Sequence, residues 1–543
     1  MKEIYLKNPD PVYLKSALKH SLVCDSIGKL IQKNAILEET GLNFSSKYQK
    51  LSSLTIYICT KLNILFPQAG YDKDAFYFSA LPKSNYLSYQ VNQKDKEISI
   101  DTLELKQFQL SEAIRNLENQ LQSFAISNSP KELTILKEEL YSKRVEAYLL
   151  SFKIKKRKIF MDSYPVDVLQ ESIPDHKAIV NYNIADSVLY TILMDNTKIQ
   201  IRQTNISKEF YSNISDLYKS IKTGKSDFGN CATYLSDILI KPIIDELDAK
   251  TELVIIPDGD LFRIPFDLLP VSNLDSKSYL IEKFAISYNY SPFLWYKSNE
   301  KSLKNKGCED NLLAMAPVFA KDEDAIISDD NPFRSDSLLI RDGIFNSMGK
   351  SLSELPYSYK EVKSIERLFD KQDKKSKVLC FGDACEESFK KYAGEYKYIH
   401  LATHGFSSIN NVNLSGLFFS QNENSQIDKD FTNDGFLYSG EMYCLENSAD
   451  LVVLSACKTG TGRIAQGEGV LGIPRGFIYA GVPNIMVSLW KIHDKNTKDL
   501  MVDFYENLLA GDDYAIALKK AKLTQIKKGA LPLDWSGIVL IGN

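Results

Sequence analysis

The sequence predicts an α/β fold in which a mainly parallel sheet, flanked by helices, follows an all-α N-terminal region. From position 166 onward, short apolar runs alternate with helical segments, which is the order of elements in a parallel sheet. Before that position, apolar residues recur at steps of three and four, the period of amphipathic helices. The chain has 543 residues, 44% of them hydrophobic, which is enough to bury the cores of roughly two to four folded units.

Residues 1–165 are predicted to form a helical arm. Helices are expected over residues 13–35 and 44–65, where the apolar residues follow a helical period. The Trp, Gly and Pro landmarks of a TPR unit, which repeats at roughly 34 residues, are absent, so the arm contains at most degenerate TPR-like repeats. The composition of this region suggests a sensor or a docking surface.

A helical hairpin is predicted within the same arm, from apolar stripes over residues 110–124 and 133–154. Between the stripes, Ser-Pro-Lys-Glu at 129–132 forms a capping box that starts the second helix. The basic cluster at 153–158 is interpreted as a solvated helix end, because cations stabilise a last turn and no aromatic residues for base stacking interrupt it. Direct binding of nucleic acid is therefore not expected.

Residues 166–305 and 306–543 are predicted to form two α/β lobes. Their apolar, β-branched runs, bounded by turn residues, indicate strands that are covered on both faces. The strands expected in the first lobe are 178–182, 188–193, 198–202, 253–257 and 284–290, with a helix over 227–247. The strands expected in the second lobe are 312–315, 377–381, 398–402, 451–455, 484–489 and 537–541.

Two strands of the second lobe end in reactive side chains. The run from Tyr398 leads to His404 and Gly405, and the run from Leu451 leads to Cys457. Because parallel strands deliver their carboxyl ends to one edge of a sheet, His404 and Cys457 are expected to meet there. An imidazole can take the proton of a thiol and later protonate a leaving amine. The pair predicts a cysteine peptidase, with backbone N–H groups of Gly405 and Cys457 as an oxyanion hole.

The other histidine and cysteine positions favour structural roles. His400 has the spacing of a metal ligand relative to His404 only on a helix, and the β-rich run around it favours a packed strand residue, so no metal site is predicted. Cys385 follows an alanine, but acidic residues come directly after it, which favours a helix start and opposes a thiolate. The remaining cysteines show no CxxC spacing and are interpreted as structural: Cys24, Cys59, Cys231, Cys308, Cys380 and Cys444.

The segment from Gly460 to Ala465 matches the loose G-x-G-x-x-A form of a dinucleotide-binding turn. That turn opens a helix at once, whereas glycines at 467, 469 and 472 continue to interrupt this segment. We therefore interpret it as a flexible loop beside the nucleophile, and no cofactor is expected. A nucleotide-dependent enzyme stays as an alternative interpretation.

The sequence around His404 and Cys457 resembles the CHAT family, whose caspase-like domains are often attached to TPR repeats and which is similar to the caspase, gingipain and separase clan. Roughly the last two thirds of the chain takes part in the resemblance. The matching segments are LVVLSACKTGTG (451–462), GEGVLGIPRGFIYAGVPNIMVSLW (467–490), WSGIVLIG (535–542), LVIIPDGDLFRIPFDLL (253–269), LPYSYKEVKSIERL (355–368) and residues 178–182.

The resemblance implies a pseudo-caspase lobe over 166–305 and a catalytic caspase-like lobe over 306–543. It implies a cysteine endopeptidase that cleaves one dedicated protein and stays inactive until an activating protein or ribonucleoprotein docks on the helical arm. Relatives of this kind serve in bacterial antiphage defence, with gasdermin-like or CRISPR-associated targets, and this role rests on family analogy alone. The alternative is a catalytically idle caspase-like scaffold that binds signalling partners.

Two segments are considered for substrate contacts. Residues 486–490 resemble the strand beside the substrate cleft of caspase-like enzymes, so Ser488 and Trp490 are candidates for binding an extended peptide. A plain sheet strand with Trp490 as core filler is an equal alternative. The loop over 407–440 separates the two strands of the dyad, and its acids Asp428, Asp430 and Asp434 suggest a pocket for a basic side chain.

Charge and cysteine content are consistent with a cytoplasmic protein. The net charge of −4 is unremarkable for a chain of this length. No apolar stretch approaches the roughly 18 residues of a membrane span, and the N-terminus lacks a signal-peptide core. Eight scattered cysteines, one of which is needed as a thiolate, fit a reducing compartment. The expected partners are therefore proteins.

Overall fold

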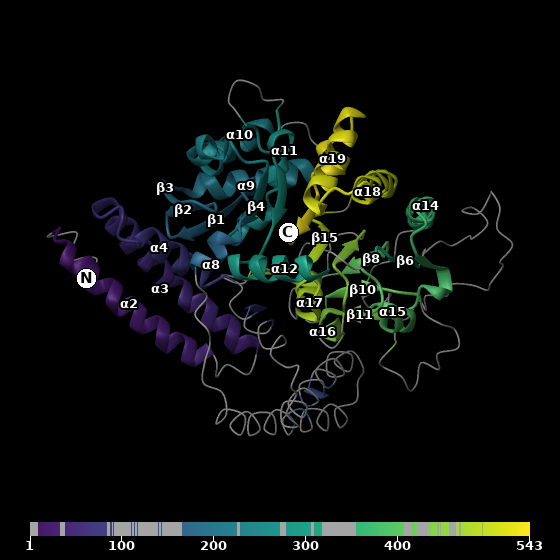
Figure 1. Ribbon diagram of the computed structural model, residues 1–543, viewed down its shortest axis with the longest axis horizontal. Helices are drawn as coiled ribbons and strands as arrows, with labels where there is room; N and C mark the ends of the chain where they lie inside the picture. Colours follow the sequence, from purple (N-terminus) through teal and green to yellow (C-terminus); the bar gives the residue numbers. More distant parts are fainter. Residues whose placement is uncertain are drawn as a thin grey trace.

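A computed structural model gives the fold of this chain (Figure 1). It describes residues 9–32, 38–83, 87–88, 91, 110, 113–114, 117, 140, 143, 166–224, 228–271, 278–305, 309–317, 355–406, 415–420, 433, 435–442, 445, 447–455, 463–465, 469–490 and 492–543. Statements about what is present or absent refer to these residues.

One large sheet forms the centre of the molecule. Seven of its neighbouring strand pairs are parallel, and the three antiparallel pairs are β1 with β2, β2 with β3, and β15 with β16. The prediction of a mainly parallel sheet flanked by helices is thus confirmed. The described strands, in spatial order, are β3 (Ile199–Asn205), β2 (Val188–Met194), β1 (Lys177–Ala185), β4 (Glu252–Ile256), β5 (Ala285–Tyr288), β16 (Ile538–Ile541), β15 (Asn484–Ser488), β12 (Leu451–Leu454), β8 (Tyr398–Leu401), β6 (Leu312–Ala316) and β7 (Ser376–Cys380).

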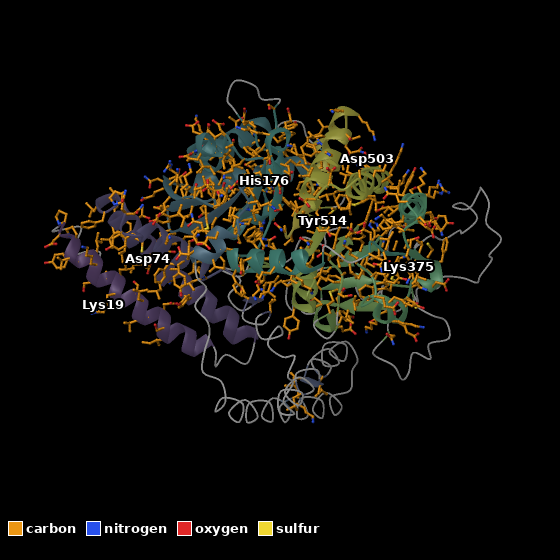
Figure 2. All side chains as sticks on the ribbon, viewed as in Figure 1. Lys19, Asp74, His176, Lys375, Asp503 and Tyr514 are labelled. Carbon is orange, nitrogen blue, oxygen red and sulfur yellow. The ribbon has the colours of Figure 1, made fainter. Side chains whose placement is uncertain are left out.

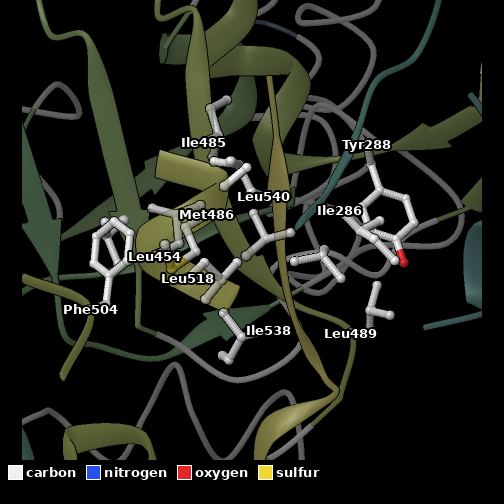
Figure 3. Close-up of a cluster of buried hydrophobic side chains, with 14 of the residues drawn as sticks. Ile286, Tyr288, Leu454, Ile485, Met486, Leu489, Phe504, Leu518, Ile538 and Leu540 are labelled. Carbon is white, nitrogen blue, oxygen red and sulfur yellow. The ribbon is translucent and has the colours of Figure 1, made fainter. Parts of the chain in front are cut away.

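All eleven strands predicted for the two lobes are present in this sheet. The sheet runs through the predicted boundary at residue 305, because β5 of the first lobe pairs with β16 of the second through Tyr288 and Ile541. Figure 3 shows the apolar side chains at this junction, which include Ile286 of β5 and Leu540 of β16. The boundaries between the lobes stay a prediction.

Helices cover both faces of the first-lobe half of the sheet. Alternate residues of β1 point into two different cores, one on each face. Ala178, Val180 and Tyr182 belong to the core that also contains side chains of α9 (Lys208–Lys222) and α10 (Gly229–Leu239). Ile179, between them in sequence, belongs to the core on the opposite face. That second core is completed by the N-terminal arm, so the arm takes the place of a helical layer.

Three helices make up the described part of the arm: α2 (Pro11–Gln32), α3 (Glu38–Leu65) and α4 (Tyr71–Ala80). The first two confirm predicted helices, and α4 was not predicted. Figure 2 shows Lys19 of α2 on the outer side of the arm. The predicted hairpin, with its capping box and basic cluster, lies almost wholly outside the described residues, although Leu110, Leu117 and Leu140 are helical and buried.

The second lobe is covered by α14 (Pro356–Lys371), α18 (Asp494–Leu509) and α19 (Tyr514–Lys527) along one side of the sheet (Figure 1). The shorter helices α15 (Glu386–Tyr392), α16 (Ser439–Met442) and α17 (Ile473–Ala480) lie along the other side, together with α12 (Pro292–Asn305) of the first lobe. Both faces are therefore buried, as the apolar runs of the strands predict.

Short strands occupy parts of two segments that were predicted as loops. The segment 407–440 contains β10 (Gly416–Phe418) and β11 (Phe436–Tyr438), which form a small sheet with β9 (Gly405–Phe406). After position 462, β13 (Arg463–Ala465) pairs with β14 (Gly469–Leu471) as an antiparallel hairpin. Strands of two or three residues are too short to show an alternating pattern, so sequence periodicity missed them.

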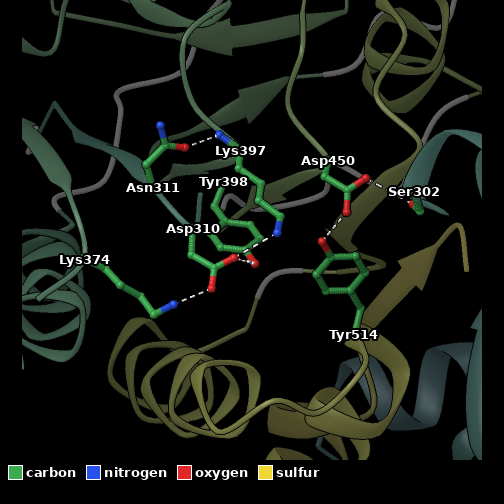
Figure 4. Close-up of polar contacts among 8 residues, drawn as sticks. All are labelled: Ser302, Asp310, Asn311, Lys374, Lys397, Tyr398, Asp450 and Tyr514. Carbon is green, nitrogen blue, oxygen red and sulfur yellow. Dashed lines mark hydrogen bonds and ion pairs between the residues drawn. The ribbon is translucent and has the colours of Figure 1, made fainter. Parts of the chain in front are cut away.

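A polar network ties the amino ends of the second-lobe strands together (Figure 4). Asp310 accepts hydrogen bonds from the ammonium groups of Lys374 and Lys397 and, at 2.8 Å, from the hydroxyl of Tyr398. Burial opposes ionisation of Asp310, but these three donors outweigh it and lower its pKa to about 2. At the amino end of β12, Asp450 accepts hydrogen bonds from the hydroxyl groups of Tyr514 and Ser302.

We expect Asp310→Asn to lower the free energy of unfolding by about 1 kcal/mol at pH 7, a value that allows for screening of a partly exposed carboxylate. The pKa of Asp310 is depressed in the folded state, so its contribution is present above the unfolded pKa near 4 and is lost as the pH falls toward 2. The difference between the urea midpoints of wild type and variant should therefore be smaller at pH 3 than at pH 7. An equal difference at both values would contradict this assignment.

Candidate active site at the carboxyl edge of the second lobe

The two strands that lead to His404 and Cys457 lie side by side. β8 and β12 pair in parallel, with Leu451 opposite Tyr398 and Leu454 opposite Leu401. The chain goes from β6 outward to β7 and then returns to β8 on the other side of β6. Open α/β sheets bind ligands at such a reversal, outside the carboxyl ends of the strands. His404, just after β8, lies at this point.

His404 is held at the end of β8 by the neighbouring small sheet. Its side chain is 7% exposed. The backbone N–H of Phe418 in β10 donates to the carbonyl of His404 at 3.0 Å, and the hydroxyl of Thr403 donates to the carbonyl of Phe418. Phe418 thus contacts the backbone of His404 and the side chain before it, which fixes the direction in which the chain leaves the strand.

The backbone N–H of Gly405 points away from β10. Residues opposite each other in an antiparallel pair alternate between hydrogen-bonded and non-hydrogen-bonded pairs. Because His404 and Phe418 are hydrogen-bonded, the next pair, Gly405 with Leu417, is of the other kind. β9 is an edge strand in the described order of this small sheet. The Gly405 N–H therefore faces away from β10.

Cys457 lies outside the described residues, and Ser455 is the last described residue of the run that leads to it. Ser455 is half-buried, next to the fully buried strand β12. The candidate pocket acids Asp428, Asp430 and Asp434 also lie outside the described residues, as do Cys308 and Cys444.

His400 is a core residue, as predicted. It is fully buried in β8, and its Nε2 lies 2.9 Å from a carboxylate oxygen of Glu361 on α14. Its Nδ1 lies 3.3 Å from the hydroxyl of Tyr505 on α18. Both ring nitrogens are therefore used in hydrogen bonds that join the strand to two covering helices.

Two other cysteines of the second lobe are also explained. Cys385 is 8% exposed and precedes the first residue of α15, which confirms the predicted helix start. Cys380 ends the edge strand β7, where burial raises the pKa of its thiol to about 12. A thiol with so high a pKa is a poor nucleophile at neutral pH.

Strand β15 is paired on both sides over only part of its length. Residues Asn484 to Met486 pair with β12, and residues Ile485 to Ser488 pair with β16. Trp490 is fully buried and donates from Nε1 to the carbonyl of Leu533 at 2.8 Å. Ser488 is 4% exposed. A role of Ser488 or Trp490 in substrate binding stays a prediction.

The glycine-rich turn after position 459 does not continue as the helix that a dinucleotide-binding turn requires. Residues 463–465 form strand β13 instead. Gly469, in the paired strand β14, has a φ of +74° and lies against the rings of Phe262 and Tyr290 in the first lobe. Sequence reasoning missed this contact between lobes, because nothing in a local pattern links residue 262 to residue 469.

Sequence reasoning also missed a link between the arm and the carboxyl edge of the first lobe. Lys83 follows α4 and is 4% exposed. Its ammonium group donates to the carbonyls of Tyr182, Ile256 and Pro257, which lie in β1 and just at the end of β4. The lysine directly after a helix was the only local signal of this link. Its hydrogen-bond partners lie about 100 or more positions away in the sequence, so no local pattern could identify them.

Comparison with known proteins places these features in context. A family model described as "CHAT domain" matches residues 229–543, more than half of the chain. "Tetratricopeptide repeat protein 28" of Homo sapiens is 24% identical over 345 residues, which is 57% of this chain and 13% of that protein. The Mus musculus protein of the same name is 32% identical over 109 residues, 20% of this chain and 4% of that protein. The chain thus spans a small part of the length of these curated relatives.

Among solved structures, the Saccharomyces cerevisiae separase–securin complex has a chain similar to this one, with a TM-score of 0.50 and 11% identity. The match covers 98% of this chain and 37% of that one, and at this identity it shows a shared fold. The chain therefore shares its fold, a mainly parallel sheet preceded by helices, with that separase chain. None of the helices in the described ranges has both the length and the apolar character that crossing a membrane requires.

Proposed function

This chain belongs to the CHAT domain family, and we propose that it is a cysteine endopeptidase that cleaves a protein substrate with Cys457 and His404. The observation that carries the proposal is the parallel register of β8 and β12, which ends both strands at one edge. Cys457 follows Leu454 by three positions, as His404 follows Leu401. Chain geometry keeps its Cα within about 7 Å of that of Ser455, which supports a meeting of the two side chains at this edge.

In the proposed reaction, His404 takes the proton of the Cys457 thiol, and the thiolate attacks the carbonyl carbon of the scissile peptide bond. The carbonyl π electrons move to oxygen, and the resulting oxyanion accepts hydrogen bonds from the N–H groups of Gly405 and Cys457. When the C–N bond breaks, His404 gives its proton to the leaving amine. Water, deprotonated by His404, then hydrolyses the thioester and restores the thiol. The direction of the Gly405 N–H, away from β10, supports its place in this scheme.

The surroundings of His404 support its role as the base. Thr403 and Phe418 fix the backbone on either side of the ring, and the low exposure of His404 shields it from bulk water. A general base needs a defined position more than a large contact area, because proton transfer requires hydrogen-bond distances. His400 is already engaged by Glu361 and Tyr505, which supports His404 as the base.

We further propose that the substrate is one dedicated protein and that a protein or ribonucleoprotein docked on the arm activates cleavage. A cytoplasmic role in bacterial antiphage defence, against gasdermin-like or CRISPR-associated targets, follows from analogy with the family. The direct packing of α3 and α4 against the first-lobe sheet supports a control function for the arm. A catalytically idle scaffold is the alternative function.

The experiment that tests this function is incubation with a peptidyl acyloxymethyl ketone, a thiol-directed electrophile, followed by mass mapping of the modified residue. We expect modification at Cys457, loss of modification in His404→Ala, and unchanged modification in Cys385→Ala, a matched cysteine that also follows an alanine. In parallel, proteins encoded by neighbouring genes are incubated with wild type and Cys457→Ala, and new termini are mapped. Cleavage that survives in Cys457→Ala would refute the peptidase, and folded wild type that neither reacts nor cleaves, either alone or with those proteins present as candidate activators, would favour the scaffold.

A further inference from the structure

The β13–β14 hairpin, which begins at Arg463, rests on two aromatic rings of the first lobe. Phe262 and Tyr290 stack with ring centroids 5.8 Å apart and an angle of 30° between their planes, and we refer to them as the aromatic pair. A Cβ at Gly469 would lie 2.8 Å from Phe262 and 3.0 Å from Tyr290. Gly469 also has a φ of +74°, a region that favours glycine. The backbone of the hairpin therefore fits closely on this pair.

The arm contacts the same pair. Leu87 of the arm, Tyr290 and Leu294 of the first lobe, and Val470 of the hairpin form one buried apolar cluster, in which Leu87 is fully buried. Phe262 and Val91 pack around it. Three parts of the chain that are far apart in sequence thus share one small core.

Lys83, four positions before Leu87 in the sequence, ties the arm to the first lobe. The Lys83 ammonium is buried and uses three backbone carbonyls as acceptors, at the carboxyl edge of the first-lobe strands. The buried carboxylate of Asp258 lies near this cation and accepts from Gln49 of α3 at 3.3 Å and from the N–H of Ile184 at 2.8 Å. Because a buried cation is tolerated only where acceptors surround it, the arm can dock here in one register.

The packing under the aromatic pair is incomplete. A cavity of about 20 Å³, the space of a single water, is lined by the pair and by side chains that include Val470, Val487, Leu489 and Val539. Val470 belongs to the hairpin, Val487 to β15 and Val539 to β16, and Leu489 directly follows β15. A gap at such a contact lowers the resistance of the hairpin to displacement, since the atoms that line it lack partners on one side.

We propose that Phe262 and Tyr290 are positioning residues for the segment that carries Cys457, and that the arm regulates cleavage by holding this pair through Leu87. The inference rests on the proposed peptidase function and deepens it. Arg463, where the hairpin starts, is six positions after Cys457, so a hairpin fixed on the pair limits the positions open to the nucleophile. A partner docked on the arm stabilises the packing of Leu87 against the pair, and with it the hairpin. The activating signal thus needs no contact with the active site itself.

The test compares glycine and leucine substitutions with matched controls in the full chain. Gly469→Ala adds a Cβ against the pair, whereas Gly529→Ala adds one at a φ of +83° with nothing within 4 Å, so both carry backbone strain but only the first clashes. Leu87→Ala empties the shared cluster, whereas Leu14→Ala removes an equally buried leucine from the other core of the arm. Phe262→Leu is a milder variant of the pair if Gly469→Ala does not fold.

The main readout is the reaction of Cys457 with the peptidyl acyloxymethyl ketone, resolved into the limiting rate and the apparent affinity. We expect Gly469→Ala and Leu87→Ala each to lower the limiting rate at least tenfold with unchanged affinity, and the double variant to lose no more than the stronger single one. Gly529→Ala and Leu14→Ala should keep the wild-type rate. Equal effects in a test variant and its control, or multiplicative effects in the double variant, would overturn the proposal.

Hydrogen exchange separates this inference from the proposed function. In a Cys457→Ala background, Leu87→Ala should speed exchange of the amides at 469–471 at least tenfold, and Leu14→Ala should not. This readout does not depend on catalysis. Absence of labelling in wild type, both alone and with the candidate activators present, would refute the peptidase, while unchanged exchange in Leu87→Ala would refute the link between arm and hairpin whatever the activity.

Discussion

Substitution of Cys457 or His404 by alanine should lower kcat/KM for protein cleavage by at least about 10⁴-fold, the scale of loss when a nucleophile or its base is removed. The variant that carries both substitutions should have a kcat/KM no lower than that of the less active single variant, because the thiol and imidazole act as one unit. KM should change little, since neither side chain contributes mainly to ground-state binding. The substrate is a protein that the mapping of new termini has identified. Its cleavage, measured at several substrate concentrations, separates the effects on kcat and on KM.

His400 provides the internal control for this prediction. It stands four positions before His404 in the same run, but its ring is bonded to Glu361 and Tyr505 within the core. His400→Ala should therefore lower the free energy of unfolding by about 3–5 kcal/mol, because it leaves Glu361 buried without its partner. The molecules that remain folded should keep their activity to within a few fold. A loss at His400 as large as that at His404, in folded protein, would contradict the roles given to the two histidines.

The strands that carry the candidate site could be predicted from the sequence because their signals are local. Runs such as Leu451–Leu454 are apolar throughout and end at turn residues, and in the structure they are buried on both faces. The order of the strands did not need to be known to expect His404 at a carboxyl edge. Pairing of β8 with β12 then followed from the fold rather than from either run alone.

Contacts between distant segments could not be predicted in the same way. Whether β15 is an edge or a central strand depends on β16, about fifty residues later, so the sequence left Trp490 equally open to substrate contact and core packing. The hydrogen bonds of the Lys83 ammonium group and the contact of Gly469 with Phe262 depend on docking between distant parts of the chain. Such docking leaves no periodic pattern in the sequence. Once the structure is known, the contact can be recognised by an unusual residue, here a buried lysine or a glycine.

A buried ion pair between the lobes gives the second large expected effect. Lys522 of α19 is 1% exposed and lies 3.1 Å from a carboxylate oxygen of Asp267, which belongs to a short 3₁₀ turn of the first lobe (Phe266–Leu268). Burial raises the pKa of Asp267 and lowers that of Lys522, and each partner opposes the effect on the other. Lys522→Met should lower the free energy of unfolding by about 3–5 kcal/mol, because it leaves a carboxylate buried without its cation.

The double variant Lys522→Met/Asp267→Leu should recover most of that loss, since replacing both charges by apolar groups removes the cost of burying them. In Lys522→Met alone, the pKa of Asp267 stays above its unfolded value, so the folded state takes up a proton first and the deficit should shrink as the pH falls toward 5. Urea denaturation of the three proteins at pH 8 and pH 5 tests both statements. If the double variant were as unstable as the single one, the pair would act through shape rather than charge. The joint between the lobes would then depend on the apolar contacts of β5 and β16, which the charge substitutions leave in place.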